Sequence, residues 1–206
     1  VMLKPVDACS SRGVYRCFNE KELRAFEGEA LQQSSSARII VEESVIGDEF
    51  TAHYTIANGR VSLASVDDRY PVTVHEGDPT TIPVARIYPF LFLDEYLKQV
   101  DPYMKELCKD LGARNAILFV QGLYDNKTNS FCIFEAGLRS AGEAPYRFIK
   151  RINEVNAMDV LVDHVLSVPS EFASEKDDPR MKGKCCGIVS FVTKGGRVGE
   201  IIGLEE

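Results

Sequence analysis

A lysine and a small polar loop near the N-terminus form the first group of residues with a chemical use. Lys4 lies in the apolar stretch of residues 1–6, and residues 7–13 follow as a loop. The side chains of the loop that suit phosphate are those of Ser10, Ser11 and Arg12. Backbone N–H groups together with two cations form a phosphate site, although the Walker A spacing is absent. A lysine on the solvent face of a strand is the alternative.

A row of carboxylates follows the next apolar stretch. Glu42 and Glu43 come directly after residues 39–41, and Glu49 lies just beyond Gly47. An adenine ring needs an apolar slot with a few hydrogen-bonding groups, and the ribose hydroxyls need an acceptor. Glu49 has the position for that acceptor. The alternative is a solvated strand edge.

The composition narrows the class of protein. The chain has 206 residues and a net charge of −7, which argues against a nucleic-acid scaffold. No apolar run reaches the ~20 residues that span a bilayer, so we expect no membrane partner. The six cysteines include no CxxC pair, which predicts free, buried thiols and a cytoplasmic protein. Three histidines without a partner pattern, His53, His75 and His164, are expected to be structural or exposed.

The periodicity of apolar residues predicts an α+β chain with mostly antiparallel strands. The expected strands are residues 1–6, 14–17, 37–43, 49–57, 60–66, 117–123, 130–134, 188–192 and 198–202. The expected helices are residues 20–33, 91–111, 145–154 and 158–166. Asn58-Gly59 is a two-residue hairpin signal. Residues 67–89 have several Pro and Asp and no period, so we expect an irregular surface excursion there.

Three blocks, taken in order, resemble the ATP-grasp superfamily. They are Lys4-Pro5 with Ser10-Ser11-Arg12-Gly13-Val14, then Glu42-Glu43-Ser44-Val45-Ile46-Gly47-Asp48-Glu49-Phe50, then Phe119-Val120-Gln121 with Phe134-Glu135-Ala136-Gly137-Leu138-Arg139-Ser140-Ala141-Gly142. The resemblance covers most of residues 1–166. It implies the ATP-grasp fold, in which two subdomains with antiparallel sheets clasp a nucleotide. The expected subdomains are residues 1–43 and residues 44–206.

The resemblance also implies the nucleotide contacts. Lys4 would bind the α- and β-phosphates, and the loop with Ser10, Ser11 and Arg12 would close over the phosphates, Arg12 near the γ-phosphate. Glu42, Glu43 and Val45 would contact adenine, and Glu49 would hold the ribose. Relatives place a further cation against the phosphates near residues 67–70, where Arg69 is the candidate and Asp68 is expected to orient it.

The third block implies a metal site and a catalytic arginine. Gln121 and Glu135 align with magnesium ligands, and Arg139 aligns with the arginine that steadies the transferred phosphoryl group. The residue types agree, because Mg²⁺ takes hard oxygen ligands and the two residues would lie on adjacent strands of one hairpin. A surface glutamine and a hairpin ion pair are the alternative. The common family pattern is Glu-x-Asn-Pro-Arg, but here Gly137 and Leu138 replace Asn and Pro. This leaves open whether the chain is fully active.

The implied activity is that of an ATP-dependent carboxylate–amine ligase with ATP and Mg²⁺, which works through an acyl-phosphate and uses Lys4, Arg12 and Arg139 in catalysis. The blocks are closest to a carbamoyl-phosphate-synthase-like or carboxylate–amine branch. The resemblance to the biotin-carboxylase branch is weaker, because that branch carries Lys at the position of Glu43. The alternatives are a nucleotide-binding or regulatory module with impaired catalysis and a small-molecule kinase. Relatives carry an N-terminal domain before this point, so we expect it as a partner and expect little activity without it. The sequence names neither the carboxylate nor the amine, and it leaves the oligomeric state open.

Overall fold

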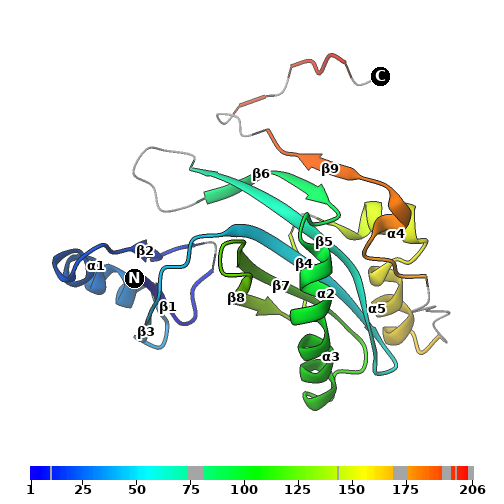
Figure 1. Cartoon of the computed structure of the whole chain (residues 1–206), viewed down its shortest axis with the longest axis horizontal. Helices are drawn as coiled ribbons and strands as arrows, with labels where there is room; N and C mark the ends of the chain where they lie inside the picture. The colour runs from blue at the N-terminus through cyan, green and yellow to red at the C-terminus, as the bar shows by residue number, and fades with distance from the viewer. Residues whose placement is uncertain are drawn as a thin grey trace.

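The chain forms two antiparallel sheets with five α-helices among its described residues (Figure 1). The computed structural model describes residues 1–9, 11–73, 81–142, 144–168, 176–191, 196–197 and 199–203. The strands are β1 (Met2–Pro5), β2 (Tyr15–Arg16), β3 (Ile39–Glu42), β4 (Asp48–Ala57), β5 (Arg60–Thr73), β6 (Thr81–Tyr88), β7 (Ala116–Asp125), β8 (Ser130–Gly137) and β9 (Cys186–Val189). The helices are α1 (Glu20–Gln33), α2 (Leu93–Gln99), α3 (Asp101–Asp110), α4 (Tyr146–Asn153) and α5 (Ala157–Val165), with a 3₁₀ turn at Met181–Gly183.

The small sheet has the strand order β2-β1-β3 and packs against α1. Asn19 caps this helix, because its side chain accepts a hydrogen bond from the Glu22 N–H at 3.0 Å. The Glu22 carboxylate in turn accepts from the Phe18 N–H at 2.8 Å. Such reciprocal capping fixes a helix start from local sequence, and the predicted helix over residues 20–33 is confirmed.

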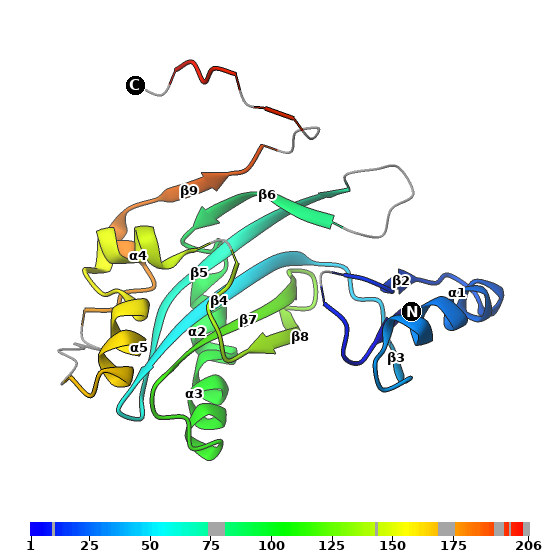
Figure 2. The same cartoon turned by 180° about the vertical axis from the view of Figure 1, so that it is seen from behind.

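The large sheet has the strand order β8-β7-β4-β5-β6-β9. Side chains alternate between the two faces of a strand, so the even-numbered residues of β4 enter the core, as Phe50 and Tyr54 do. That core lies under α2 and α3, which cross in front of the sheet in Figure 1. The odd-numbered residues of β4 lie on the other face, which we call the polar face. In Figure 2, α4 and α5 lie at the end of the large sheet that is farther from the small sheet.

The expectation of an irregular excursion over residues 67–89 is wrong. β5 continues to Thr73, and β6 pairs with it from Asp68↔Ile87 to Thr73↔Thr81. The register shifts between Tyr70 and Pro71, and such irregularities are where a sheet tolerates proline. Because Pro71 and Pro83 interrupt the strand pattern, the sequence did not predict this long hairpin. Residues 74–80 lie outside the described part of the chain.

Two further expectations are corrected. The helix expected over residues 91–111 is two helices, because α2 ends at Gln99 and α3 begins at Asp101 with Pro102 in its first turn. The expected terminal hairpin is also wrong. β9 pairs with β6, and the described residues 199–202 lie in no strand. The backbone N–H and C=O groups of β9 bond to β6 at the edge of the sheet, so β9 needs no partner strand close to it in sequence.

Two expectations drawn from composition can be compared with the structure. All six cysteines are free thiols, as predicted, but the expectation that they are buried holds only for Cys17 and Cys108. In the described ranges, no helix is both long enough and apolar enough to cross a bilayer.

Candidate active site

Four charged side chains from three strands gather on the polar face of the large sheet. This charge cluster consists of Glu49 (β4), Asp67 and Arg69 (β5) and Arg86 (β6). The cross-strand register aligns Glu49 with Arg69 and Arg69 with Arg86. Arg69 donates to the Glu49 carboxylate, and Arg86 Nη1 donates to Asp67 Oδ2 at 2.8 Å. The side chains are 18%, 0%, 10% and 2% exposed in chain order, so the charges must compensate one another.

The electrostatics of the charge cluster reflect this burial. Burial raises the pKa of Glu49, while the Arg69 and Arg86 cations act in the opposite direction. Arg69 Nε is buried and has no hydrogen-bond partner among the described residues. A buried donor without a partner is costly, so the cluster retains capacity to donate to an anion.

His53 extends the charge cluster along β4. Its Nε2 lies 3.0 Å from Asp67 Oδ1, and both side chains are buried. Asp67 therefore has one partner on each carboxylate oxygen. This agrees with the structural role expected for His53. His164 is exposed, and His75 lies outside the described residues.

Gln121 and Glu135 are direct Cα partners across β7 and β8. Directly paired residues present their side chains on the same face of a sheet, and Gln121 is also the partner of Thr51 on β4. The prediction that both residues lie on adjacent strands of one hairpin is therefore confirmed. The pair supplies one amide and one carboxylate on the face that carries the charge cluster.

Arg139 lies just past the end of β8, beside this pair. Its Nη2 is 3.8 Å from Glu135 Oε1, and its Nη1 donates to the Ser140 carbonyl at 3.1 Å. Its Cζ lies 4.6 Å from the centroid of the Phe119 ring. The guanidinium is 63% exposed and can therefore meet a ligand.

On the small sheet, Lys4 and Glu42 form an ion pair. Lys4 Nζ is 2.5 Å from Glu42 Oε1, between the adjacent strands β1 and β3. Arg12 makes local contacts, because its Nε donates to the Cys9 carbonyl at 3.2 Å and its Nη2 to Cys9 Sγ at 3.0 Å. Ser11 is exposed, whereas Ser10 lies outside the described residues.

Residues 43–47 connect the two sheets. Glu43 is exposed and Val45 is half-buried. Gly47 passes so close to β7 that an added Cβ would lie 2.5 Å from the Tyr124 carbonyl oxygen. A glycine is therefore required where the connection enters the large sheet.

Sequence reasoning missed several residues of the polar face. Arg86 and Asp67 belong to a stretch interpreted as irregular, so their burial was not foreseen. The expectation that Asp68 orients Arg69 is wrong, because alternation turns Asp68 to the other face, where it accepts from the Leu91 N–H at 3.0 Å. Phe119 was quoted only as part of a block. Asp67 directly follows the apolar and small residues 61–66. A carboxylate at the end of such a stretch needs a compensating partner, and this could have marked Asp67 as a site residue.

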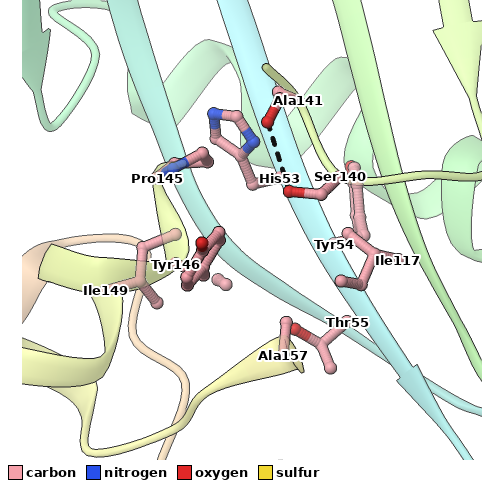
Figure 3. Close-up of a pocket in the computed structure, with 11 residues that line it drawn as sticks. His53, Tyr54, Thr55, Ile117, Ser140, Ala141, Pro145, Tyr146, Ile149 and Ala157 are labelled. Atoms are coloured by element: carbon pink, nitrogen blue, oxygen red, sulfur yellow. Dashed lines mark hydrogen bonds between the residues drawn. The ribbon is translucent and has the colours of Figure 1, made fainter. Parts of the chain in front are cut away.

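A small pocket lies on the polar face beyond Arg139 (Figure 3). It is bounded by the sheet on one side and by the start of α4 and α5 on the other. Its lining residues are His53, Tyr54, Thr55, Ala64, Ile117, Ser140, Ala141, Pro145, Tyr146, Ile149 and Ala157. The Ser140 hydroxyl donates to the Ala141 carbonyl at 3.2 Å. The lining is mostly apolar, unlike the neighbouring charge cluster.

The described parts of the chain contain no group of three or more His, Cys, Asp or Glu that could hold a metal ion. Gln121 and Glu135 offer two hard oxygen ligands, which suits Mg²⁺ when a substrate supplies further oxygens. The donor set therefore fits a magnesium ion shared with phosphate groups and does not fit a protein-only metal site.

The structure thus combines two antiparallel sheets, the Gln121–Glu135 pair with Arg139 beside it, and a lysine on the small sheet. A family model for the ATP-grasp domain matches residues 1–145. The chain therefore belongs to the ATP-grasp family, which confirms the resemblance seen in the three sequence blocks. No curated protein sequence matches the chain.

Solved structures share the fold at low sequence identity. L-amino acid ligase from Bacillus licheniformis is 19% identical with a TM-score of 0.70, over 94% of this chain and 45% of that one. Phosphoribosylglycinamide synthetase from Anaerococcus prevotii is 18% identical with a TM-score of 0.58, over 81% and 40%. The biotin carboxylase domain of Hydrogenobacter thermophilus 2-oxoglutarate carboxylase, in complex with MgADP, ADP and bicarbonate, is 17% identical with a TM-score of 0.67, over 85% and 38%. The chain spans less than half the length of each.

Proposed function

We propose that the chain is the ATP-binding part of an ATP-dependent ligase that joins a carboxylate to an amine. The observation that carries the proposal is the pairing of Gln121 with Glu135 beside Arg139, on the same sheet face as the charge cluster. Membership of the ATP-grasp family supports the use of ATP. Two structural neighbours are named as an amino acid ligase and a synthetase, which supports ligation as the reaction class.

We assign the nucleotide contacts by residue. In the proposal, the subdomains are residues 1–43 and 44–206, and ATP lies between them. Lys4 meets the α- and β-phosphates, and the loop with Ser10, Ser11 and Arg12 covers the phosphates. The adenine contacts are Glu42, Glu43 and Val45, and Glu49 holds the ribose. The partner of Lys4 in the structure is Glu42, which is consistent with a lysine placed at the edge of an adenine site.

Arg69 is the proposed second cation for the phosphates. Its pairing with Glu49 holds the guanidinium on the polar face, and its Nε lacks a partner among the described residues. Gln121 and Glu135 would hold Mg²⁺, as the MgADP complex of one structural neighbour supports for the fold. When bound, the metal neutralises charge on the phosphate oxygens.

The proposed reaction has two steps. A carboxylate oxygen of the substrate attacks the γ-phosphorus, the bond from that phosphorus to the bridging oxygen of ADP breaks, and an acyl-phosphate forms. The amine nitrogen then attacks the acyl carbon, the carbon–oxygen bond to phosphate breaks, and the nitrogen loses a proton to solvent. The side chains that contribute positive charge are Lys4, Arg12 and Arg139, at the place where negative charge develops on the phosphate oxygens. The sheets hold these groups in position.

One observation favours a second candidate, a nucleotide-binding module with impaired catalysis. Gly137 supplies no oxygen at the position where the common family pattern has Asn, and the Phe119 ring occupies the adjacent space. A kinase that stops after phosphoryl transfer is the remaining alternative. Six free thiols favour a reducing compartment, so we place the protein in the cytoplasm as part of the proposal.

The test is phosphate release from ATP by the full-length protein, measured across a panel of amino acids as carboxylates and amines. The ligase is supported when release requires both substrates and an amide product appears. Nucleotide binding without release on any pair favours the impaired module, and a stable phosphorylated product favours the kinase. A protein that binds no ATP overturns the proposal. An N-terminal domain of the kind that relatives carry is the proposed partner, so we expect weak ATP binding and little turnover without it.

A further inference from the structure

The ring of Phe119 lies directly beneath the guanidinium of Arg139. Phe119 is on β7, two residues before Gln121, and only 2% of it is exposed. The 4.6 Å between Arg139 Cζ and the ring centroid is inside the ~6 Å range of a cation–π contact. A buried ring therefore offers a flat surface to an exposed arginine.

Gly137 is what allows the ring to occupy this place. It is the Cα partner of Phe119 across β7 and β8. A Cβ added at Gly137 would lie 2.5 Å from Phe119 Cε1 and 3.0 Å from Cζ, so the ring or the strand would have to shift to make room. The ring thus fills the space that a side chain at position 137 would need.

The other contacts of Arg139 hold it less firmly. Its ion pair with Glu135 is long, at 3.8 Å, and exposed on both sides, so it contributes little. If Glu135 engages a divalent cation, that attraction weakens further, because the carboxylate charge is then shared. Among the described residues, the remaining contacts of the guanidinium are the Ser140 carbonyl and the Phe119 ring.

We propose that Phe119 is a positioning residue, which holds the Arg139 guanidinium over its ring and beside the Gln121–Glu135 pair. The glycine at position 137 is then part of this arrangement, because the Phe119 ring that supports the cation fills the space beside Gly137, where the common pattern has an Asn side chain. The catalytic meaning of this contact rests on the proposed function of Arg139. The stacking itself does not, so the two can be tested separately.

The stacking is tested by NMR on the full-length protein with labelled arginine and no ligand. Protons over an aromatic face are shielded, so the Arg139 side-chain signals, assigned with Arg139→Lys, should lie upfield. Phe119→Leu should remove this shift, and Phe119→Tyr should keep it. The matched control is Phe18→Leu, which removes a ring under Arg16 at 5.4 Å in the small sheet region and should leave the Arg139 signals unchanged.

The role of Gly137 is tested in the same spectra. Gly137→Ala should move the Arg139 signals when Phe119 is present and should have little effect in the Phe119→Leu background, where the clash is relieved. Equal effects in both backgrounds, or an Arg139 signal that ignores Phe119→Leu and Gly137→Ala alike, overturn the proposal. The tyrosine variant keeps the aromatic face, so it remains informative even where the leucine variant is poorly folded.

Kinetics then connect the stacking to the reaction. Phe119→Leu should lower kcat about two- to fivefold, the change equivalent to a cation–π contact of ~0.5–1 kcal/mol, with little change in KM for ATP. Phe119→Tyr should restore kcat. Loss of the NMR shift with unchanged kcat overturns the positioning role. A protein with the NMR shift but no ATP-dependent turnover contradicts the proposed function and not the stacking.

Discussion

The buried pair of Asp67 and Arg86 gives the sharpest prediction about stability. Asp67→Asn keeps the shape of the side chain and removes its charge. Asp67 is 0% exposed and accepts from Arg86 Nη1 at 2.8 Å, with His53 Nε2 3.0 Å from its other oxygen. The variant leaves the two buried cations of the charge cluster with one carboxylate fewer, and water cannot replace it.

The magnitude follows from this burial. Breaking a fully buried ion pair on one side costs ~3–5 kcal/mol of unfolding free energy. In a protein of about this size each kcal/mol lowers Tm by ~2–4 °C, so we expect Asp67→Asn to lower Tm by roughly 6–20 °C. Urea unfolding followed by circular dichroism measures the free energy, and calorimetry measures Tm.

Two further variants make this prediction sharp. Asp67→Asn combined with Arg86→Met removes both charges of the pair and should recover much of the loss, because an apolar replacement of a buried pair is often tolerated. Arg24→Gln breaks an exposed pair with Glu20, 73% and 74% exposed, and should change stability by ~0.5 kcal/mol or less. A loss below ~1 kcal/mol for Asp67→Asn, or a double variant no more stable than the single one, would refute the electrostatic reasoning.

Four other outcomes are expected. Arg139→Met should lower kcat about a hundredfold or more while the nucleotide Kd changes little, and equal losses in both would contradict its assigned role. Glu135→Gln should weaken Mg²⁺-dependent nucleotide binding roughly tenfold in calorimetric titrations, and unchanged Mg²⁺ dependence would count against the metal site. Burial raises the pKa of Asp68 from 3.8 to about 6, so the folded state holds its proton more tightly than the unfolded state. Stability should therefore increase from pH 7 to pH 5, with ~1 kcal/mol of the increase from Asp68 after allowance for solvent screening of this half-buried group. Burial also raises the pKa of Asp177 to about 6, so Asp68→Asn should reduce this increase without abolishing it. Gly47→Ala should destabilise the protein by ~1–3 kcal/mol, because the new Cβ meets the Tyr124 carbonyl, whereas Gly28→Ala in open space on α1 should stabilise it by up to ~1 kcal/mol. Equal effects of the two alanines in urea unfolding would exclude the steric reason.

Features with short-range causes were predictable from the sequence. The start of α1 depends on Asn19 and Glu22, which are three residues apart. The hairpin of β4 and β5 depends on the turn residues Asn58 and Gly59, and both elements are confirmed. The pairing of Gln121 with Glu135 was also predictable, because a single polar turn joins their strands.

The assembly of the polar face required the tertiary structure. Arg86 and Asp67 are 19 residues apart, and their contact depends on a hairpin that two prolines disguised. β9 pairs with β6 about a hundred residues earlier in the chain, so no local pattern marks its partner.

The α+β class, the helix over residues 20–33 and the β4–β5 and β7–β8 hairpins follow from local propensity and short turns, so they could be predicted from the amino-acid sequence. The placement of Asp67 on the polar face and of Asp68 on the opposite face became clear only from the folded chain. The same holds for the Phe119 ring in the space beside Gly137. The register between strands that are distant in sequence determines which of two adjacent residues is buried and which side chains it contacts. The neighbouring residues in the sequence do not specify that register.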